Sequence, residues 1–405
     1  MLEEIPWVKT CSMGIWVGSG SRFETPESAG ASHFIEHMLF KGTETKSAYD
    51  IAMQMDEIGG TLNAYTTKEY TCFYVRSLTE HVSLAFDILC DMLTSPRMDK
   101  SDIETERGVI LEELAMYEDS PEDLCSDLLY DGVWGSDMIG KNILGTRQSL
   151  SETNENTLRL HMEKYYVPER TVISFCGKFD RDCVLEMCEK YFGAMKGTDN
   201  PIVGSVPEYR KSIITCKKPF EQNQLALIFP GVSAQDENKT AVSLACTILG
   251  GSTSSRLFQK LREQLGLVYS VDAFNVPYLG GGLVGITMGL SKKSEATALR
   301  ETMKILSSFP EEISEEELRR VQEQSISLFI MGLESTSARA ARTAQNELLL
   351  NSVEDEDSVI KRVRSVTTSQ LSSAASSLFN PDNLSLCCVG KVHDEDFYKE
   401  TLNIR

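Results

Sequence analysis

The 405-residue sequence has no long hydrophobic run and no apolar segment at its start. An uninterrupted apolar stretch of about eighteen residues or more, as a membrane-spanning helix requires, is absent, so we expect no membrane partner. The first ten residues, MLEEIPWVKT, are acidic where a secretory signal would be basic and then apolar. We therefore expect a protein of the bacterial cytoplasm.

Basic residues are also scarce. The chain has 40 Lys and Arg against 60 Asp and Glu, which gives a formal net charge of -20. Nucleic acid binding requires a stripe of Lys and Arg that neutralises phosphates, and no such stripe is visible, so we expect no nucleic-acid partner. An acidic enzyme would instead favour cationic substrates. Part of this charge has a local explanation, because Ser314 and Glu317 have the spacing of a helix capping box.

The eleven cysteines lack CxxC spacing and are odd in number. This pattern argues against a disulfide framework and is typical of a reducing compartment. We interpret the cysteines as small buried apolar residues or inert thiols.

The chain contains an internal repeat. PERTVISFCGKF (168–179) and PDNLSLCCVGKV (381–392) align without a gap at an offset of 213 residues, and each follows a helix-like stretch. An ancient duplication would leave this pattern, although two short apolar strands can also resemble each other by chance. Gly, Pro and Asp between the halves are typical of a linker. We predict a first lobe at residues 1–200, a linker at 201–212 and a homologous second lobe at 213–405.

The order of strand-like and helical segments is mixed rather than strictly alternating. It favours an α+β fold, with two similar lobes that each contain an antiparallel or mixed sheet backed by helices. At 405 residues the chain is long enough to build two substantial cores.

Two of the five histidines lie in one short apolar segment, ASHFIEHML. On a helix, His33 and His37 lie four residues apart on one face, and Glu36 lies beside them. This H-x-x-E-H pattern is the inverse of the zincin motif H-E-x-x-H and predicts a metal site with an adjacent carboxylate. The alternative is a helix whose two histidines form local hydrogen bonds.

A catalytic zinc ion usually takes three protein ligands, so a further donor is needed. The segment SDIETERGVILEELAMYEDSPED predicts a helix that opens with a capping box at Ser101 and Glu104. Glu106 and Glu113 lie two turns apart on a stripe shared with Ile110. A buried carboxylate needs a cation or hydrogen-bond donors, so Glu106 and Glu113 are both candidates for the third metal ligand. The alternative is that both side chains simply border the solvent.

These motifs resemble those of a known family. HFIEHMLFKGT followed by ERGVILEELAMYEDSP is similar to the M16 metallopeptidases, the pitrilysin-like inverzincins that include mitochondrial processing peptidase and insulin-degrading enzyme. The resemblance extends through GGSTSSRLFQKLREQLGLVYSV to the last strand. It implies a zinc endopeptidase that binds one zinc ion per chain in the first lobe.

The resemblance implies roles for individual residues of the first lobe. His33, His37 and Glu113 match the zinc ligands, Glu36 the general base and Glu106 a supporting carboxylate. Phe40 matches an aromatic residue that lines the pocket for the substrate residue after the cut. Asn63 and Ala64 match an edge strand that binds the substrate backbone, and Asp123 and Asp127 match acids for a substrate arginine.

The second lobe matches the family's recognition lobe. Arg262 and Tyr269 match a pair that holds the substrate backbone across a chamber, although without the family such residues would more often serve packing. The repeat offset places Cys246, Leu249 and Gly250 opposite the zinc motif, so this lobe is expected to be metal-free.

The family also implies a partner chain. The resemblance implies a homodimer that cleaves extended peptides near basic residues, with active sites shared between the chains. The alternative is a catalytically quiet substrate-binding or assembly subunit. Such subunits usually lack part of the motif, which is complete here.

Overall fold

The computed structural model describes residues 1–198 and 201–403, and they form two compact units that are each built from three segments. The segments of the first unit are Met1–Leu114, Lys141–Val203 and Ile330–Val353. Those of the second are Ala115–Gly140, Gly204–Phe329 and Glu354–Arg405. Each unit combines a mixed sheet with helices, so the predicted α+β fold is confirmed.

The sheet of the first unit has the strand order β1-β5-β2-β4-β3. Its strands are β1 (Leu2–Glu4), β2 (Thr10–Val17), β3 (Thr61–Thr66), β4 (Thr71–Leu78) and β5 (Thr171–Gly177). β1 runs parallel to β5, and the remaining neighbours are antiparallel. β3 therefore lies at an edge of the sheet.

Successive side chains along β2 point to opposite faces of this sheet, as they do in any β-strand. Met13 and Ile15 face the main core with the helices α1 (Ala31–Leu39) and α3 (Val82–Thr94), whereas Trp16 faces α12 (Thr336–Leu350). The other helices of this unit are α2 (Ala48–Glu57), α4 (Lys100–Asp119, up to Leu114), α6 (Arg147–Glu152), α7 (Glu155–Tyr165) and α8 (Arg181–Phe192).

The second unit repeats this arrangement, with the strand order β6-β10-β7-β9-β8. Its strands are β6 (Ile213–Lys217), β7 (Asn223–Gly231), β8 (Val268–Tyr278), β9 (Gly281–Leu290) and β10 (Ser385–Gly390). Its helices are α5 (Pro121–Trp134), α9 (Lys239–Leu249), α10 (Glu295–Glu312), α11 (Glu315–Gly332, up to Phe329), α13 (Glu356–Ser365), α14 (Thr368–Leu378) and α15 (Glu395–Leu402).

The repeat seen in the sequence corresponds to equivalent strands. β5 and β10 occupy the same position in their sheets, and each has a parallel neighbour on one side and an antiparallel neighbour on the other. Each strand ends at a glycine with positive φ, 131° at Gly177 and 134° at Gly390. A Cβ atom at Gly177 would lie 2.3 Å from the Thr10 carbonyl oxygen, so a larger residue is disfavoured there. The duplication thus extends to the backbone conformation.

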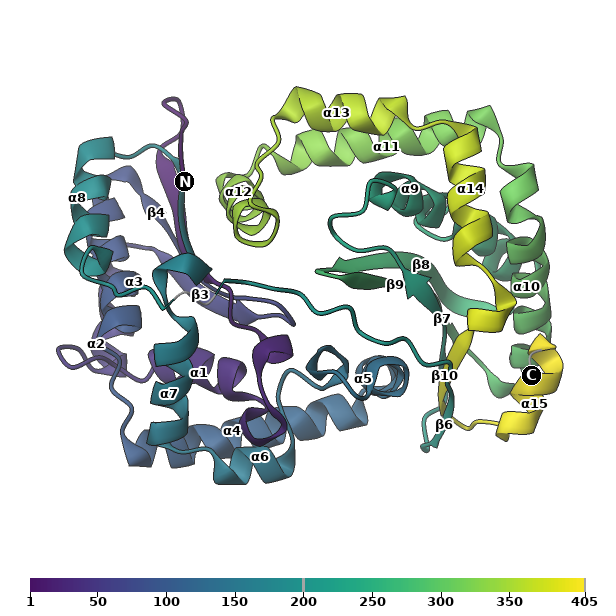
Figure 1. Cartoon of the computed structure of the whole chain (residues 1–405), viewed down its shortest axis with the longest axis horizontal. Helices are drawn as coiled ribbons and strands as arrows, with labels where there is room; N and C mark the ends of the chain where they lie inside the picture. Colours follow the sequence, from purple (N-terminus) through teal and green to yellow (C-terminus); the bar gives the residue numbers. More distant parts are fainter. Residues whose placement is uncertain (199–200, 404–405) are drawn as a thin grey trace. The chain divides into compact units, whose positions relative to one another are not determined.

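Each half of the chain contributes one helix to the other half's sheet (Figure 1). In the first unit, Ala340, Ala344 and Leu348 of α12 pack against the sheet face that contains Trp16. In the second unit, α5 packs against β7 and β10. The predicted lobes follow the duplication, whereas the compact units follow packing, and the two divide the chain differently.

The lobe boundaries at 1–200 and 213–405 therefore stay a prediction about the duplicated sequence. Their ends at 199–200 and 404–405 lie outside the described residues. Residues 201–212, the predicted linker, contain no helix or strand.

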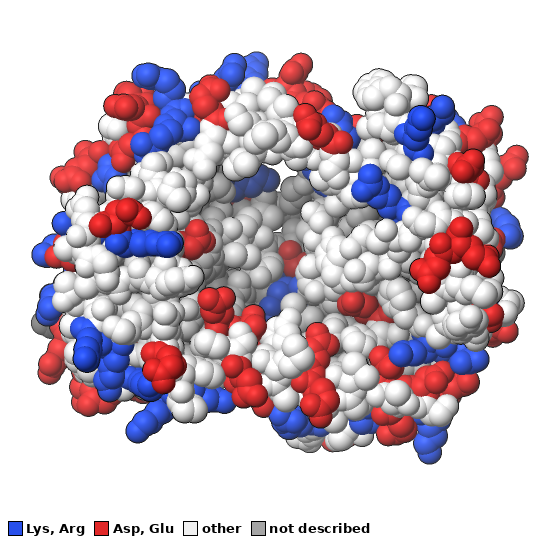
Figure 2. Space-filling model, turned by 180° about the vertical axis from the view of Figure 1, so that it is seen from behind, with Lys and Arg blue, Asp and Glu red and all other residues white. Residues whose placement is uncertain are grey.

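The cysteines form no disulfides, as their number and spacing predicted. All eleven cysteines are free, and eight of them are buried. Figure 2 shows acidic and basic side chains interspersed over the face that it displays. Within the described residues, each helix is too short or too polar to cross a bilayer.

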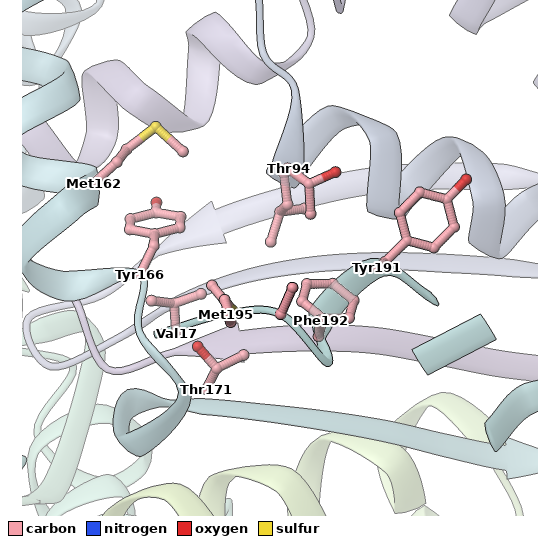
Figure 3. A pocket seen from close by; sticks show the side chains of 10 residues that line it. Val17, Thr94, Met162, Tyr166, Thr171, Tyr191, Phe192 and Met195 are labelled. Atoms are coloured by element: carbon pink, nitrogen blue, oxygen red, sulfur yellow. The ribbon is translucent and has the colours of Figure 1, made fainter. Parts of the chain in front are cut away.

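A pocket of about 340 Å³ opens in the first unit beside β2 and β5 (Figure 3). Val17, Met162 and Phe192 give it an apolar lining, and the hydroxyl of Tyr166 there is buried without a hydrogen-bond partner among the described residues. Its lining contains none of the residues that the sequence predicts for catalysis, so the candidate site lies elsewhere.

Candidate metal site

Helix α1 holds the H-x-x-E-H segment against the core of the first unit. Phe34, Ile35 and Met38 are fully buried, and this apolar face fixes the rotation of the helix. His33 and His37 then lie one turn apart with ring centroids separated by 4.6 Å. The predicted pairing of the two imidazoles on one helix face is therefore present.

A buried carboxylate caps the start of α1. Glu24 is 6% exposed, and its two oxygens accept hydrogen bonds from the backbone amides of Gly30 and Ser32, both at 2.7 Å. Burial raises the pKa of Glu24 to about 7, although the two amides favour the carboxylate. These bonds satisfy amide groups that a helix N-terminus leaves unpaired, so Glu24 fixes where α1 begins.

The Glu113 side chain comes from α4 and meets both histidines. Its Oε2 atom lies 3.6 Å from His33 Nε2 and 3.7 Å from His37 Nε2. These distances exceed those of good hydrogen bonds. They are close to the separation of about 3.4 Å between two ligands of a tetrahedral zinc ion. Within the described part of the chain, these three residues form the one group with metal-ligand spacing.

The protonation of His33 also suits a metal ligand. Burial, followed by the nearby His37, lowers the pKa of His33 to about 3. The imidazole is therefore neutral at physiological pH and keeps a lone pair for a metal. The donor set of two imidazoles and one carboxylate fits zinc.

Glu106 orients His37 from behind. Its Oε2 atom lies 2.9 Å from His37 Nδ1, and its Oε1 atom lies 2.6 Å from Lys41 Nζ. Because Nδ1 donates to the carboxylate, the Nε2 lone pair of His37 points toward the metal group. His33 Nδ1, by contrast, is buried and has no hydrogen-bond acceptor among the described residues.

Glu36 lies beside the metal group and is held by another element. Thr66, the last residue of β3, donates a hydrogen bond from Oγ1 to Glu36 Oε2 at 2.5 Å. Burial raises the pKa of Glu36, with the Thr66 bond acting in the opposite direction. The carboxylate is thus partly withdrawn from water and keeps one oxygen available.

Comparison with known proteins identifies the family. Residues 1–147 match "Insulinase (Peptidase family M16)", and residues 154–325 match "Peptidase M16 inactive domain". The chain belongs to peptidase family M16. It is 39% identical to YmxG, an uncharacterized zinc protease of Bacillus subtilis, with 94% of this chain and 93% of that protein covered.

Other similar proteins also match over most of their length. An uncharacterized zinc protease of Streptomyces coelicolor is 34% identical, with 97% of this chain and 87% of that protein covered. Among solved structures, a protease from Helicobacter pylori superposes with a TM-score of 0.88 at 18% identity, over 96% of each chain. A peptidase M16 inactive domain from Pseudomonas fluorescens gives a TM-score of 0.90 at 18% identity, over 97% of this chain and 95% of that one. The structural matches support the two-part M16 fold.

The M16 resemblance also predicted substrate-binding residues in the first unit. Phe40 caps the C-terminus of α1 and packs partly against the core. Asn63 is exposed on the edge strand β3, and Ala64 is buried beside it. The structure therefore places these three residues in the same unit as the metal group.

The remaining predicted residues belong to the second unit. Arg262 lies on a π-helical segment, Phe258–Gln264, and its guanidinium carbon is 5.7 Å from the ring centroid of Tyr269 on β8. Tyr269 is 69% exposed, so its side chain is not packed into the core. Asp123 and Asp127 lie one turn apart on α5, where Ser120 caps the helix.

Three residues around the candidate metal site were not predicted from the sequence: Glu24, Lys41 and Thr66. Lys41 lies just beyond the end of α1, so helical spacing does not predict its contact with Glu106. Glu24 and Thr66 reach α1 from other segments, and no local pattern marks them.

One sequence prediction about α4 is wrong. The helix begins at Lys100, and no capping box forms between Ser101 and Glu104. The Glu104 carboxylate pairs instead with Arg107, one turn later, at 3.2 Å. The carboxylates that matter for the site, Glu106 and Glu113, are unaffected.

Replacing Glu106 by glutamine is expected to weaken zinc binding by about 10- to 100-fold, because His37 loses the charged partner that fixes its tautomer. Zinc affinity measured by competition with a chromophoric chelator checks this. The matched control is Glu112→Gln, which changes an exposed glutamate of the same helix. Equal affinities for the Glu106 and Glu112 variants would contradict the role of Glu106.

Proposed function

We propose that this chain is a zinc-dependent endopeptidase that hydrolyses extended peptides. The observation that carries the proposal is the convergence of His33 Nε2 and His37 Nε2 on one oxygen of Glu113, with Glu36 alongside. The zinc protease relatives and the M16 family membership support it.

The residues around the metal group then divide the work. A bound zinc ion would lower the pKa of a water molecule and polarise the peptide carbonyl. Glu36 would remove the proton from that water and deliver it to the leaving amine. Glu106 holds His37, and Glu24 holds the start of the helix, so the reacting groups are fixed before substrate arrives.

The edge strand β3 supplies the simplest place for an extended peptide. Its one strand neighbour among the described residues is β4, so the other side of its main chain is available for pairing. A peptide added there forms backbone hydrogen bonds irrespective of its sequence. Phe40 would contact a substrate side chain, and Asp123 and Asp127 would favour basic substrates.

We further propose that the enzyme is a homodimer in which Arg262 and Tyr269 of one chain act at the metal site of the other. The pair is available for such a role because the Tyr269 ring is exposed and the Arg262 guanidinium stacks over it. Donors of this kind stabilise the negative charge that develops on the carbonyl oxygen. The chamber between the lobes of a dimer would then contain the substrate.

The proposal is tested with the full chain and an internally quenched peptide that contains basic residues. Cleavage is expected with zinc, to be lost with a chelator and to return when zinc is restored. A matched peptide with its basic residues replaced by glutamine tests the preference. Cleavage that is insensitive to chelation and zinc would contradict the proposal.

Mixing two variants tests the shared site. Glu36→Gln and Tyr269→Phe each impair every site in their own homodimers, whereas a hybrid dimer contains one intact site if Tyr269 acts in trans. Random exchange is expected to restore about a quarter of the wild-type sites. Subunit exchange is verified with two fluorescent labels, and exchange without recovery would show that Tyr269 does not act across chains.

The alternative is a catalytically quiet subunit of an M16-type complex. It predicts that the purified chain binds peptide but does not cleave it, with or without zinc. The complete set of His33, Glu36, His37 and Glu113 favours the peptidase, because a quiet subunit has no need to retain all four.

A further inference from the structure

One hydrogen bond joins the edge strand to the residue that handles protons. Thr66 Oγ1 on β3 donates to Glu36 Oε2 on α1 at 2.5 Å, across 30 positions of sequence. The short distance is typical of a hydroxyl that donates to a carboxylate. It is the contact through which a strand suited to peptide binding reaches the proposed general base.

The Thr66 hydroxyl has a single proton, and the neighbouring contacts leave it for Glu36. Thr71 Oγ1 lies 3.4 Å from Thr66 Oγ1, but Thr71 donates its own proton to the Ser19 carbonyl at 2.7 Å. A hydroxyl has one donor, whereas an ionised carboxylate only accepts. The proton of Thr66 is therefore available to one oxygen of Glu36.

The strand holds this hydroxyl in place. Thr66 pairs with Thr71 in the final step of the β3–β4 ladder, and its β-branched side chain restricts χ1. Glu36, by contrast, has a longer, more flexible side chain that is only half-buried. Thr66 thus supplies the rigid partner, and the carboxylate oxygen Oε1 is left for a substrate water.

We propose that Thr66 is a positioning residue that orients Glu36 for proton transfer. This inference rests on the proposed peptidase function and adds to it. The strand that pairs with the peptide backbone also sets the direction of the base. A peptide bound on β3 would then meet a base aligned by the same strand.

Kinetics of Thr66 variants test this role. Thr66→Val keeps the shape of the side chain and removes the hydroxyl, and it is expected to lower kcat by about 10- to 100-fold, the fold-change typical of losing a hydrogen bond to a charged group. KM is expected to change less than about twofold and zinc content to stay unchanged, because no ligand is touched. Thr66→Ser, which restores the hydroxyl, is expected to recover most of the loss.

Controls separate positioning from general damage. Thr10→Val makes the same change in β2 of the same sheet and should leave kcat unaltered. Thr66→Ala removes the hydroxyl without adding a methyl group, so it provides the test if the valine variant does not fold. In a Glu36→Gln background, Thr66→Val should cause almost no further loss, since the residue that it positions has lost its function.

A crystal structure of Thr66→Val supplies a readout that does not depend on turnover. The Glu36 carboxylate is expected to leave its wild-type position or to occupy several rotamers. An unmoved carboxylate, or wild-type kcat in both hydroxyl-free variants, would overturn the positioning role even if the enzyme is a peptidase. If the wild type does not cleave peptides but Glu36 is displaced in Thr66→Val, the proposed peptidase function is contradicted. The role of Thr66 in orienting Glu36 would still stand.

Discussion

Glu36→Gln is expected to lower kcat by about 10²- to 10⁴-fold, the range that general acid–base catalysis contributes. Glutamine has nearly the shape of glutamate, but its neutral amide cannot take a proton from water. Its carbonyl oxygen can still accept the Thr66 hydrogen bond, so the side chain should remain in place. Because Glu36 is not one of the three converging ligands, the variant should retain one zinc ion per chain.

Single-turnover cleavage of a quenched peptide and zinc analysis of the same preparation check this result. Glu44→Gln is the control, since Glu44 is exposed in the loop that follows α1. Wild-type turnover by the Glu36 variant would remove it from the chemistry. Loss of zinc together with activity would indicate that Glu36 is a ligand rather than a base.

Glu113→Gln is expected to abolish stable zinc binding, and activity with it. The Glu113 oxygen is the point on which both histidine nitrogens converge, at 3.6 and 3.7 Å. An amide oxygen is neutral and a weaker ligand than a carboxylate, so two imidazoles would hold the ion alone. Zinc affinity should fall further than in Glu106→Gln, for which a loss of about 10- to 100-fold is expected because Glu106 acts only through His37.

Native mass spectrometry after dialysis against a weak chelator measures this difference directly. Glu112→Gln, one position away on the exposed side of α4, should retain zinc like the wild type. A Glu113 variant that retains zinc under the same conditions would mean that the third ligand lies elsewhere. An unchanged far-UV spectrum would show that the loss is local to the site.

Short-range patterns in the sequence predicted much of this molecule. The spacing of Ser314 and Glu317 predicted a helix start, and the structure contains both bonds of the capping box, at 3.0 and 3.2 Å. The four-residue spacing of His33 and His37 placed both rings on one helix face. Such features depend on neighbours within one or two turns, so the local sequence is sufficient to specify them.

The packing across long separations could not be read in this way. The duplication suggested two independent halves, but α12 packs on the sheet of the first unit and α5 on that of the second. Neither helix has an apolar pattern that identifies which sheet it will cover. An amphipathic stripe specifies that a face is buried but not against which partner.

Three of the residues that help to hold the candidate ligands and Glu36 in place were also not predicted from the sequence. Glu24 lies six and eight residues before the amides that it binds, but no local pattern marks it, whereas Thr66 reaches Glu36 across 30 positions. Lys41 follows the end of α1 and meets Glu106 of another helix. Hydrogen bonds between side chains on different elements depend on the finished fold. The family resemblance led to the ligands and the base, and the structure adds the groups that hold them.

The central claim is that His33, His37 and Glu113 bind one zinc ion. Anomalous diffraction at the zinc absorption edge, from crystals of the full chain, tests it most directly. One peak per chain is predicted, at about 2.0–2.2 Å from the two Nε2 atoms and a Glu113 oxygen. A peak bound by other residues, or no peak from zinc-saturated protein, would contradict the account.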